Sequence, residues 1–328
     1  MIIVTGGAGF IGSNLVAALE ARSAGDIVVC DFMGEGEKWR NLAKRELAAI
    51  VSPERLFAYL DDNADVVDTI FHMGAISATT ERDVDLVVAS NFTLSQRLWD
   101  WCAAHQTRLI YASSAATYGD GSAGFDDDDS PTALARLRPL NAYGWSKHMF
   151  DRRVARLVIS NAPRPRQWAG LKFFNVYGPN EYHKGAMQSV VAHIYPRAKA
   201  GEAARLFRSH DPKYPDGGQQ RDFVAVEDCV AMMLWFYDHP AVNGLFNSGT
   251  GKARSFLDLA NAVYRAIGRE PKIEFVDTPP EIRDKYQYFT EARMERLRAA
   301  GYDRPAAALE AGVTAYVKNF LACADIYR

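Results

Sequence analysis

The sequence predicts a doubly wound α/β fold, in which helices cover both faces of a mostly parallel sheet. Its first half alternates short apolar runs with helical patterns, which is the order expected when each strand is followed by a helix. A glycine-rich turn directly follows the first apolar run, and such sheets gather ligands at the carboxyl ends of their strands. Because the alternation fades beyond about Tyr177, we expect a larger domain over residues 1–175, to which about 219–250 returns, and a smaller C-terminal α/β domain over 176–328.

The individual elements follow from the period of the apolar residues. Runs of β-branched and aromatic residues predict strands, whereas apolar residues three or four apart predict helices. Clusters of glycine, proline and aspartate predict loops. On these grounds we expect strands at Met1–Thr5, Ile27–Asp31, Thr69–His72, Arg108–Ala112 and Gly170–Asn175, helices at Phe10–Arg22, Asn91–His105, Ser255–Gly268 and Ala306–Leu321, and loops at Gly124–Pro131 and Ser209–Gln220.

Neither the acidic residues nor the cysteines predict a metal site. The loop at Gly124–Pro131 contains the consecutive aspartates Asp126–Asp129. Consecutive carboxylates on an extended loop do not converge on one point, so we expect this loop to be solvated. The four cysteines lie far apart without a CxxC pair, which argues against zinc or a disulfide framework.

Composition excludes several classes of protein. The 328 residues are 48% hydrophobic and 24% charged, values typical of globular chains rather than of disordered ones. A net charge of −2 argues against a broad nucleic-acid surface. No signal-peptide pattern opens the sequence, and no apolar run approaches the ~18 residues of a membrane span. We therefore expect a soluble, cytoplasmic protein that binds neither nucleic acid nor a membrane.

The glycine-rich turn predicts a dinucleotide-binding site. It lies between a strand and a helix, and Gly6 and Gly7 allow the tight turn. Gly9 lets backbone approach the pyrophosphate, and Gly12 lets the helix pack closely. The free amides and the dipole of the helix N-terminus favour phosphate. Asp31, at the end of the next strand, can accept a hydrogen bond from a ribose hydroxyl, which favours NAD. Lys38 can neutralise a 2′-phosphate, which favours NADP, so both cofactors remain open.

Three further residues predict a catalytic site. Tyr143 and Lys147 lie one helical turn apart and share one helix face. A neighbouring ammonium stabilises a phenolate, so we expect Lys147 to lower the pKa of Tyr143 toward a range in which it acts as a base. Lys147 can also hold a cofactor ribose hydroxyl. Upstream, Tyr111–Gly119 begins as a strand and ends as a hydroxyl-rich loop, whose Ser114 can hydrogen-bond an alcohol and its developing carbonyl.

In this order and spacing, these motifs resemble the extended short-chain dehydrogenase/reductase superfamily, whose members mostly modify nucleotide sugars on a Rossmann domain. The resemblance covers nearly the whole chain and includes Arg221–Val224 and Asn247–Gly251. It is closer to the ADP-L-glycero-D-manno-heptose 6-epimerase family of lipopolysaccharide core biosynthesis. The segments that carry this closer resemblance are MIIVTGGAGFIGSN, ASSAATYG, PLNAYGWSK, FNVYGP followed by His183-Lys184-Gly185, Tyr286-Gln287, and LRAAGY at Leu297–Tyr302.

The resemblance implies an isomerase that inverts C6 of ADP-D-glycero-D-manno-heptose through a 6-keto intermediate, with a bound NADP or NAD that is recycled. It implies that Tyr143 and Lys184 are the two acid/base groups. Ser114, from the hydroxyl-rich loop, completes the predicted catalytic set. It also implies a homo-oligomer, usually a pentamer. Positions that match cofactor contacts are Phe10, Ile11, Asp31, Phe32, Lys38, Met73, Gly74, Ala75, Ile76, Ser77, Asn91, Lys147 and Val176, and those that match substrate contacts are Asn175, Ala186, His193, Phe207, Arg208, Ser209, His210, Arg221 and Tyr286.

The chain departs from the family pattern at several positions. Phe32 stands where better-known members have a polar residue, and Pro53 where they have a lysine near the cofactor phosphate, so both weaken the preference for NADP. Ala186 replaces a serine and so removes one substrate hydrogen bond. The loop before Arg221 is longer, which makes the matches at Phe207–His210 approximate.

Other interpretations remain for single residues. Lys184 can be a surface or phosphate-binding lysine rather than a base, and it needs burial or a nearby cation to lower its pKa. Arg221 can clamp a substrate diphosphate or form an ordinary ion pair with Asp222. His193 can be a substrate contact or a buried core histidine.

Other interpretations also remain for the whole chain. One is a UDP-sugar 4-epimerase, which uses the same hydride chemistry at another carbon. Another is a dinucleotide-binding sensor without turnover, although such a protein should have lost part of the catalytic set that this sequence retains. A dehydratase fits less well, because Ala115 and Ala116 stand where those relatives carry an Asp-Glu pair that expels water.

Overall fold

The computed structural model describes residues 1–279, 283 and 287–328, and it confirms the predicted α/β fold. Within these ranges, seven strands form the main sheet in the order β10-β6-β5-β4-β1-β2-β3, and each neighbouring pair is parallel. The strands are β1 (Ile2–Thr5), β2 (Ile27–Cys30), β3 (Ala49–Val51), β4 (Thr69–His72), β5 (Arg108–Ser114), β6 (Gln167–Phe173) and β10 (Gly244–Ser248).

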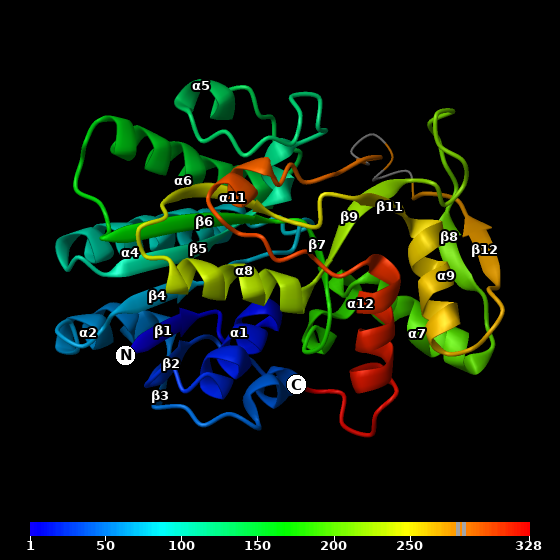
Figure 1. The fold of residues 1–328 in the computed structure, drawn as a ribbon, viewed down its shortest axis with the longest axis horizontal. Helices are drawn as coiled ribbons and strands as arrows, with labels where there is room; N and C mark the ends of the chain where they lie inside the picture. The colour runs from blue at the N-terminus through cyan, green and yellow to red at the C-terminus, as the bar shows by residue number, and fades with distance from the viewer. Residues whose placement is uncertain (280–282, 284–286) are drawn as a thin grey trace.

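Helices cover both faces of this sheet (Figure 1). On one face α1 (Phe10–Ala21) contacts α8 (Val226–Asp238), and on the other lie α4 (Leu94–Ala104) and α6 (Ala142–Ile159). This alternation follows from right-handed crossovers between parallel strands. Shorter helical segments are the 3-10 helices Glu37–Leu42, Pro53–Arg55 and Ala115–Tyr118, the helices α2 (Leu56–Asp62), α3 (Val84–Val87), α5 (Pro131–Leu134) and α11 (Glu295–Ala299), and the π-helical turn Val88–Thr93.

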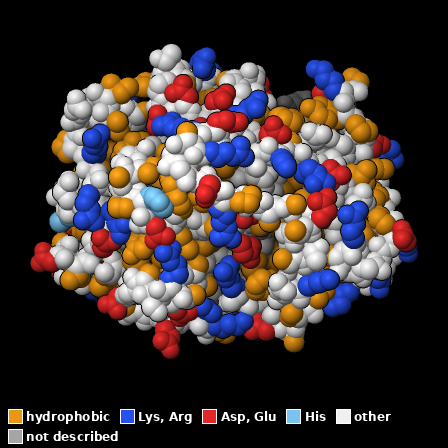
Figure 2. All heavy atoms as spheres, in the orientation of Figure 1, with side chains coloured by type: hydrophobic (Ala, Val, Ile, Leu, Met, Phe, Trp, Pro, Cys, Tyr) orange, Lys and Arg blue, Asp and Glu red, His pale blue; other side chains and the backbone are white. Residues whose placement is uncertain are grey.

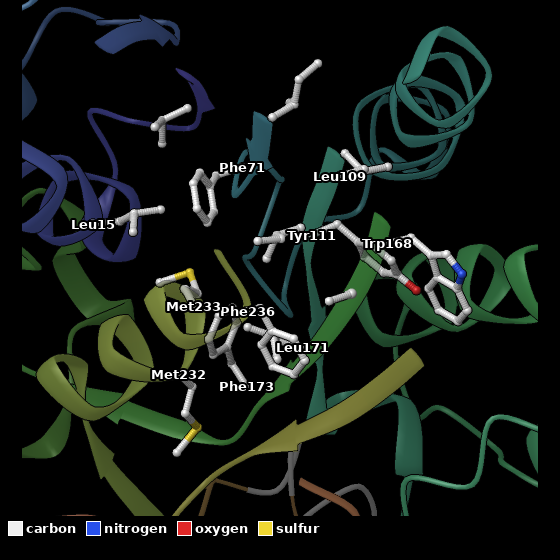
Figure 3. Packing of buried hydrophobic residues seen from close by; sticks show 14 of the residues in the cluster. Leu15, Phe71, Leu109, Tyr111, Trp168, Leu171, Phe173, Met232, Met233 and Phe236 are labelled. Atoms are coloured by element: carbon white, nitrogen blue, oxygen red, sulfur yellow. The ribbon is translucent and has the colours of Figure 1, made fainter. Parts of the chain in front are cut away.

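Apolar side chains fill both interfaces between the sheet and its helices. One cluster of fully buried side chains lies between the sheet and the helices α1 and α8, and it includes Leu15, Phe71, Met233 and Phe236 (Figure 3). On the opposite face the indole of Trp99 packs edge-on against its neighbours from α6 and β6. Burying one such side chain stabilises the fold by roughly 1.5–3 kcal/mol, so these interfaces hold the strand ends in fixed positions.

A second hydrophobic core lies beside the main sheet, at the right in Figure 1. A three-stranded sheet and a two-stranded sheet pack there against three helices, and the core includes Val191, Leu206, Val263 and Tyr316. The elements are β7 (Asn175–Tyr177), β8 (Ala204–Phe207), β9 (Gln220–Ala225), β11 (Ala253–Ser255), β12 (Ile273–Val276), α7 (Val190–Ala200), α9 (Phe256–Ala266) and α12 (Leu309–Tyr316), followed by the π-helical turn Val317–Leu321.

Several expected bounds are wrong. The run Gly170–Asn175 does not form one strand, because Phe174 leaves β6 and its amide donates to Ser248 O at 3.1 Å, after which β7 begins a different sheet. The last expected helix begins at Leu309 rather than Ala306. These differences arise from tertiary contacts that the local apolar period does not contain.

The acidic run is also not simply a solvated loop. Asp127 is 5% exposed, and its Oδ2 accepts a hydrogen bond from Asn247 N at 2.8 Å. Asp129 Oδ2 lies 3.3 Å from Leu245 N and 2.7 Å from Arg296 Nη2. Leu245 and Asn247 belong to the edge strand β10, whose outward amides need partners. Alternate aspartates therefore cap the open edge of the sheet, while the other two face solvent.

The surface carries charges of both signs. Basic and acidic side chains are intermingled over the face shown in Figure 2. This mixture agrees with the small net charge of −2. In the part of the chain that the structure describes, no helix has the length and apolar content to cross a membrane.

Candidate active site

A cleft of about 1220 Å³ lies at the carboxyl ends of the main sheet and extends to the smaller sheets. One wall is formed by Gly6 after β1, Met73 after β4 and Ser114 at the end of β5. The facing wall is formed by residues of α7, β8 and β9, including Phe207 and Arg221. This is the position at which open parallel sheets bind ligands.

The glycine turn leaves no room for side chains. Gly6 has φ +66°, a left-handed conformation that favours glycine. A Cβ on Gly12 would lie 2.1 Å from Gly6 O, and one on Gly9 would lie 3.1 Å from the same oxygen. The helix α1 begins directly after Gly9, so its first amides are free to bind an anion. This cradle fits the pyrophosphate of a dinucleotide.

The end of β2 holds the two groups that bear on cofactor choice. Asp31 Oδ2 accepts a hydrogen bond from Ala8 N at 2.9 Å, which ties the carboxylate to the glycine turn. Its other oxygen lies 2.6 Å from Lys38 Nζ, and Lys38 also donates to Phe32 O at 2.8 Å. Asp31 and Lys38 line the cleft, whereas the side chain of Phe32 is exposed beside it.

The side chain of Asn91 is hydrogen-bonded to the loop that follows β4, on the side away from the cleft. It is fully buried, and its side chain both accepts from Ile76 N at 2.8 Å and donates to Ile76 O at 2.9 Å. It also donates to Ser146 Oγ at 3.0 Å, which joins this loop to α6. Met73, Gly74, Ala75 and Ser77 line the cleft in front of it.

Tyr143 and Ser114 both line the cleft and share a hydrogen bond. Asn141 caps α6 through its side chain, so that Tyr143 stands in the first turn of the helix. Burial raises the pKa of Tyr143, while a hydrogen bond with Ser114 acts in the opposite direction. The expectation that Lys147 lowers the pKa of Tyr143 is therefore wrong for this structure, because burial outweighs the other influences.

Lys147 lies one turn beyond Tyr143, as predicted, and its Nζ donates to Ala112 O at 2.8 Å. Burial lowers the pKa of Lys147 to about 8, and the charge of Asp151 partly opposes this shift. Asp151 is itself buried and accepts a hydrogen bond from Ser113 Oγ at 2.7 Å. This arrangement keeps an ammonium on the same helix face as the Tyr143 phenol.

Lys184 also lines the cleft, from the 3-10 segment Tyr182–Met187. It is half-buried, which does not fit a simple surface lysine, and its Nζ lies 5.2 Å from the centre of the Phe10 ring. Burial lowers the pKa of Lys184, and the buried carboxylate of Glu181 opposes that shift. A lowered pKa makes the ammonium easier to deprotonate, which suits a lysine that accepts and returns a proton.

The expected substrate residues are only partly brought together. Asn175, His193, Phe207 and Arg221 line the cleft. His193 is exposed there, so the alternative of a buried core histidine is wrong. The carboxylate of Asp222, weighed as a partner of Arg221, accepts hydrogen bonds from Thr250, Gly251 and Ala292.

Among the described residues, the other expected substrate contacts (Ala186, Arg208, Ser209 and His210) do not line the cleft. Ala186 and His210 are exposed. Arg208 lies 3.2 Å from Asp216 Oδ2 and is held within its own loop, where Ser209 N donates to the same carboxylate. Tyr286 lies outside the described residues.

Other residues at the site belong to none of the motifs recognised in the sequence. Glu181 is buried beside Lys184, and Asn41 is buried between the glycine turn and the segment that precedes Lys184. Both act through long-range contacts that a single sequence does not display. Further cleft-lining residues outside the predicted set are Thr79, Thr80, Glu81, Arg197, Arg205, Gln219, Phe256, Gln287 and Thr290.

Comparison with known proteins shows the family to which the chain belongs. The model of the NAD dependent epimerase/dehydratase family matches residues 2–249. A protein of Nitratidesulfovibrio vulgaris named ADP-L-glycero-D-manno-heptose-6-epimerase is 51% identical over 328 residues, which cover 99% of each chain. A protein of the same name from Fusobacterium nucleatum subsp. nucleatum is 44% identical over 335 residues, which cover 100% of each chain.

The fold comparison agrees with the sequence comparison. The crystal structure of the Helicobacter pylori ADP-L-glycero-D-manno-heptose-6-epimerase matches with a TM-score of 0.79 at 27% identity, covering 97% of this chain and 95% of that one. The resemblance first inferred from the motifs is thereby confirmed. The chain belongs to the NAD dependent epimerase/dehydratase family, in the branch whose named members are ADP-L-glycero-D-manno-heptose-6-epimerases.

Proposed function

We propose that this protein epimerises ADP-D-glycero-D-manno-heptose at C6, giving the L-glycero epimer for lipopolysaccharide core precursors. The chain is 51% identical, over its full length, to a protein that bears this name. Both residues proposed as proton carriers, Tyr143 and Lys184, line one cleft together with the glycine turn. An arrangement with two acid/base groups suits the inversion of a carbinol carbon, which needs a proton carrier on each face.

A nicotinamide dinucleotide would be held by the glycine turn with Asp31 and Lys38, and it would supply the hydride-accepting and hydride-donating chemistry for oxidation and re-reduction at C6. Tyr143 rests as a protonated phenol, because burial raises its pKa. The hydrogen bond with Ser114 stabilises the phenolate that forms when the proton leaves. Tyr143 therefore serves one face of the sugar and Ser114 orients the hydroxyl that reacts there.

Lys184 serves the other face. Burial lowers its pKa, which favours the neutral amine. The neutral amine can accept the proton of the C6 hydroxyl, and the protonated amine can deliver it. Lys147 stays a buried cation that holds the Ala112 carbonyl and can hold a ribose hydroxyl. Oxidation followed by reduction leaves no net redox change, so a bound cofactor would need no exchange between turnovers.

We propose NADP as the preferred cofactor, with NAD as the alternative. Both oxygens of Asp31 already have partners, in Ala8 N and Lys38 Nζ, which leaves this carboxylate less free for a ribose hydroxyl. The ammonium of Lys38 pairs with Asp31 and lines the same cleft, so it suits a 2′-phosphate. Mass spectrometry of the cofactor released on denaturation tests this choice. NADP from the wild type and a loss of it from Lys38→Ala are expected, whereas NAD from both would contradict it.

We propose that residues 1–175 with about 219–250 hold the cofactor and that 176–328 mainly hold the substrate. Arg221 falls within the returning segment but lies on β9 of the smaller sheet, where it lines the cleft and can clamp a substrate diphosphate in two hydrogen bonds. His193 and Phe207 line the same part of the cleft. The role of Tyr286 in this set rests on the family resemblance alone.

We also propose a cytoplasmic homo-oligomer, with a pentamer as the form suggested by the family resemblance. Light scattering coupled to size-exclusion chromatography measures its mass directly. A mass of five chains is expected, and a monomer at micromolar concentration would contradict the assignment.

The activity is tested on purified protein without added cofactor. ADP-D-glycero-D-manno-heptose is incubated with the wild type, with Tyr143→Phe and with Lys184→Met, and the C6 epimers are followed by NMR. Conversion by the wild type alone is expected, with cofactor retained in all three proteins. Conversion of UDP-sugars in place of the heptose would instead favour a UDP-sugar 4-epimerase, and retention of cofactor without any turnover would favour a sensor.

A further inference from the structure

The segment that carries Lys184 is held from outside the cleft by residues 326–328. We call these residues the strap, and Tyr182–Met187 the Lys184 turn. The hydroxyl of Tyr182 donates to Ile326 O at 2.8 Å. The rings of Tyr182 and Tyr327 pack edge to face with their centres 5.3 Å apart. The strap therefore contacts the residue two positions before Lys184 through both a hydrogen bond and a ring.

Asn180, just before the Lys184 turn, makes a second connection. It is fully buried in a left-handed conformation, with φ +71°. Its Oδ1 accepts a hydrogen bond from Arg328 N at 2.9 Å, and its Nδ2 donates to Ser13 Oγ at 3.0 Å. Its carbonyl accepts from Asn41 Nδ2 at 3.0 Å. One residue thus joins the strap, the helix α1 and the 3-10 helix Glu37–Leu42.

The strap is itself fixed to the cofactor-binding side of the molecule. The carbonyl of Tyr327 accepts a hydrogen bond from Lys44 Nζ at 2.6 Å, and Lys44 also pairs with Asp325 at 2.8 Å. The guanidinium of Arg328 donates to Asn14 Oδ1 at 3.2 Å. The strap crosses from α12 back to α1, and the end of the ribbon lies beside α1 in Figure 1.

Lys184 meets the same helix through its side chain. Its Nζ lies 5.2 Å from the ring of Phe10, which is the first residue of α1. On the far side of the turn, the buried Glu181 accepts hydrogen bonds from the backbone and the hydroxyl of Ser189, which begins α7. The Lys184 turn is therefore held at both ends, and the strap is the part of this support that lies outside the cleft.

We propose that Tyr182 and the strap position Lys184 for proton transfer by holding its turn against the start of α1. This inference rests on the proposed function, in which Lys184 carries a proton to and from the sugar. A displacement of about 1 Å in a reacting group can lower a rate by ~100-fold, so a support of this kind acts on turnover rather than on binding. Tyr182 is a positioning residue here, because it acts through Lys184.

Two variants remove the support without touching the cleft. Tyr182→Phe keeps the ring and deletes the hydroxyl, which is bonded to Ile326 and also to Tyr316. Tyr327→Ala deletes the ring of the strap and leaves that hydroxyl in place. Tyr264→Phe is the matched control, because its hydroxyl also donates to backbone carbonyls, at 2.7 and 2.9 Å, in the core away from Lys184. For each protein, kcat, KM, bound cofactor and Tm are measured.

A second measurement follows Lys184 independently of turnover. The rate at which an amine-specific acylating reagent labels Lys184 is measured against pH by peptide mass spectrometry. The charged or titratable groups that interact with this amine are Glu181 and His183, and Lys38 and Asp31 act in turn on His183. None of them is changed in the variants, so a shift in the labelling midpoint reports a change in the burial of Lys184.

We expect Tyr182→Phe and Tyr327→Ala to lower kcat at least tenfold, with KM and bound cofactor within twofold of the wild type. The labelling midpoint of Lys184 should rise toward that of an ordinary lysine, because a loosened turn exposes the amine. Unchanged kcat and an unchanged midpoint would overturn the inference, and so would a loss of kcat that Tyr264→Phe shares. A wild type that fails to convert the heptose, combined with a raised midpoint in the variants, would overturn the proposed function and leave the positioning of Lys184 supported.

Discussion

Replacing Gly12 with alanine tests how closely α1 packs on the glycine turn. The new Cβ would lie 2.1 Å from Gly6 O, 2.8 Å from Gly6 C and 2.9 Å from Gly7 Cα. These atoms belong to the backbone and cannot turn away as a side chain can. Restoring ordinary contact near 3.4 Å needs a shift of about 1.3 Å between the helix and the turn, and overpacking of this kind costs roughly 1–3 kcal/mol.

We therefore expect Gly12→Ala to lower the free energy of unfolding by about 2–3 kcal/mol and to lose most of the bound cofactor. Urea denaturation measures the first effect, and absorbance of the released dinucleotide measures the second. Gly36→Ala is the matched control, because a Cβ there meets no atom within 4 Å. Helix propensity alone would make Gly12→Ala more stable by ~1 kcal/mol, so a stabilised variant that retains its cofactor would refute the reasoning.

Two further predictions concern buried charges. Asp222→Asn should lower the free energy of unfolding by ~3 kcal/mol, because each carboxylate oxygen accepts two buried hydrogen bonds and an amide nitrogen accepts none. Asp126→Asn, on the solvated side of its loop, is the control, and equal urea midpoints for the two would contradict this. Burial lowers the pKa of Lys172 to about 8, whereas a lysine in the unfolded chain titrates near 10.4. Between these two pH values the unfolded chain therefore binds more protons than the folded one. In that range Lys172 makes the free energy of unfolding rise with pH. Lys172→Met should reduce that slope by up to ~1.4 kcal/mol per pH unit, and a slope equal to that of the exposed Lys318→Met control would argue against it.

The local parts of the fold and of the site follow from the sequence. The apolar period placed β4 at Thr69–His72 and α1 from Phe10, because strands and helices of a packed sheet record their buried faces in the chain itself. The order of strand, glycine turn and helix predicted the phosphate-binding turn, because the steric constraints that require glycine there act between residues close in the sequence. The helical spacing of Tyr143 and Lys147 likewise placed both side chains on one face of α6.

Features that depend on distant partners did not follow. Asp127 caps a strand amide that lies 120 residues further along the chain, so the acidic run looked like a solvated loop. Asn41 lies 3.2 Å from the ring of His183, 142 residues away, and no local pattern marks either residue. The pKa of Tyr143 was expected to fall, because the spacing shows that Lys147 is near. The spacing does not show how strongly burial raises the pKa of Tyr143. Sequence patterns thus predicted the elements, and the folded chain decided which side chains meet.

The fate of the hydrogen on C6 tests the central claim most directly. ADP-D-glycero-D-manno-heptose that carries deuterium at C6 is given to the purified protein in ordinary water, without added cofactor, and the product is examined by NMR. Hydride transfer to the bound dinucleotide and back predicts an L-glycero product that keeps its deuterium, with Tyr143→Phe forming none. A product in which solvent hydrogen has replaced the deuterium would contradict the account, because inversion would then proceed by proton exchange at carbon and not by transient oxidation.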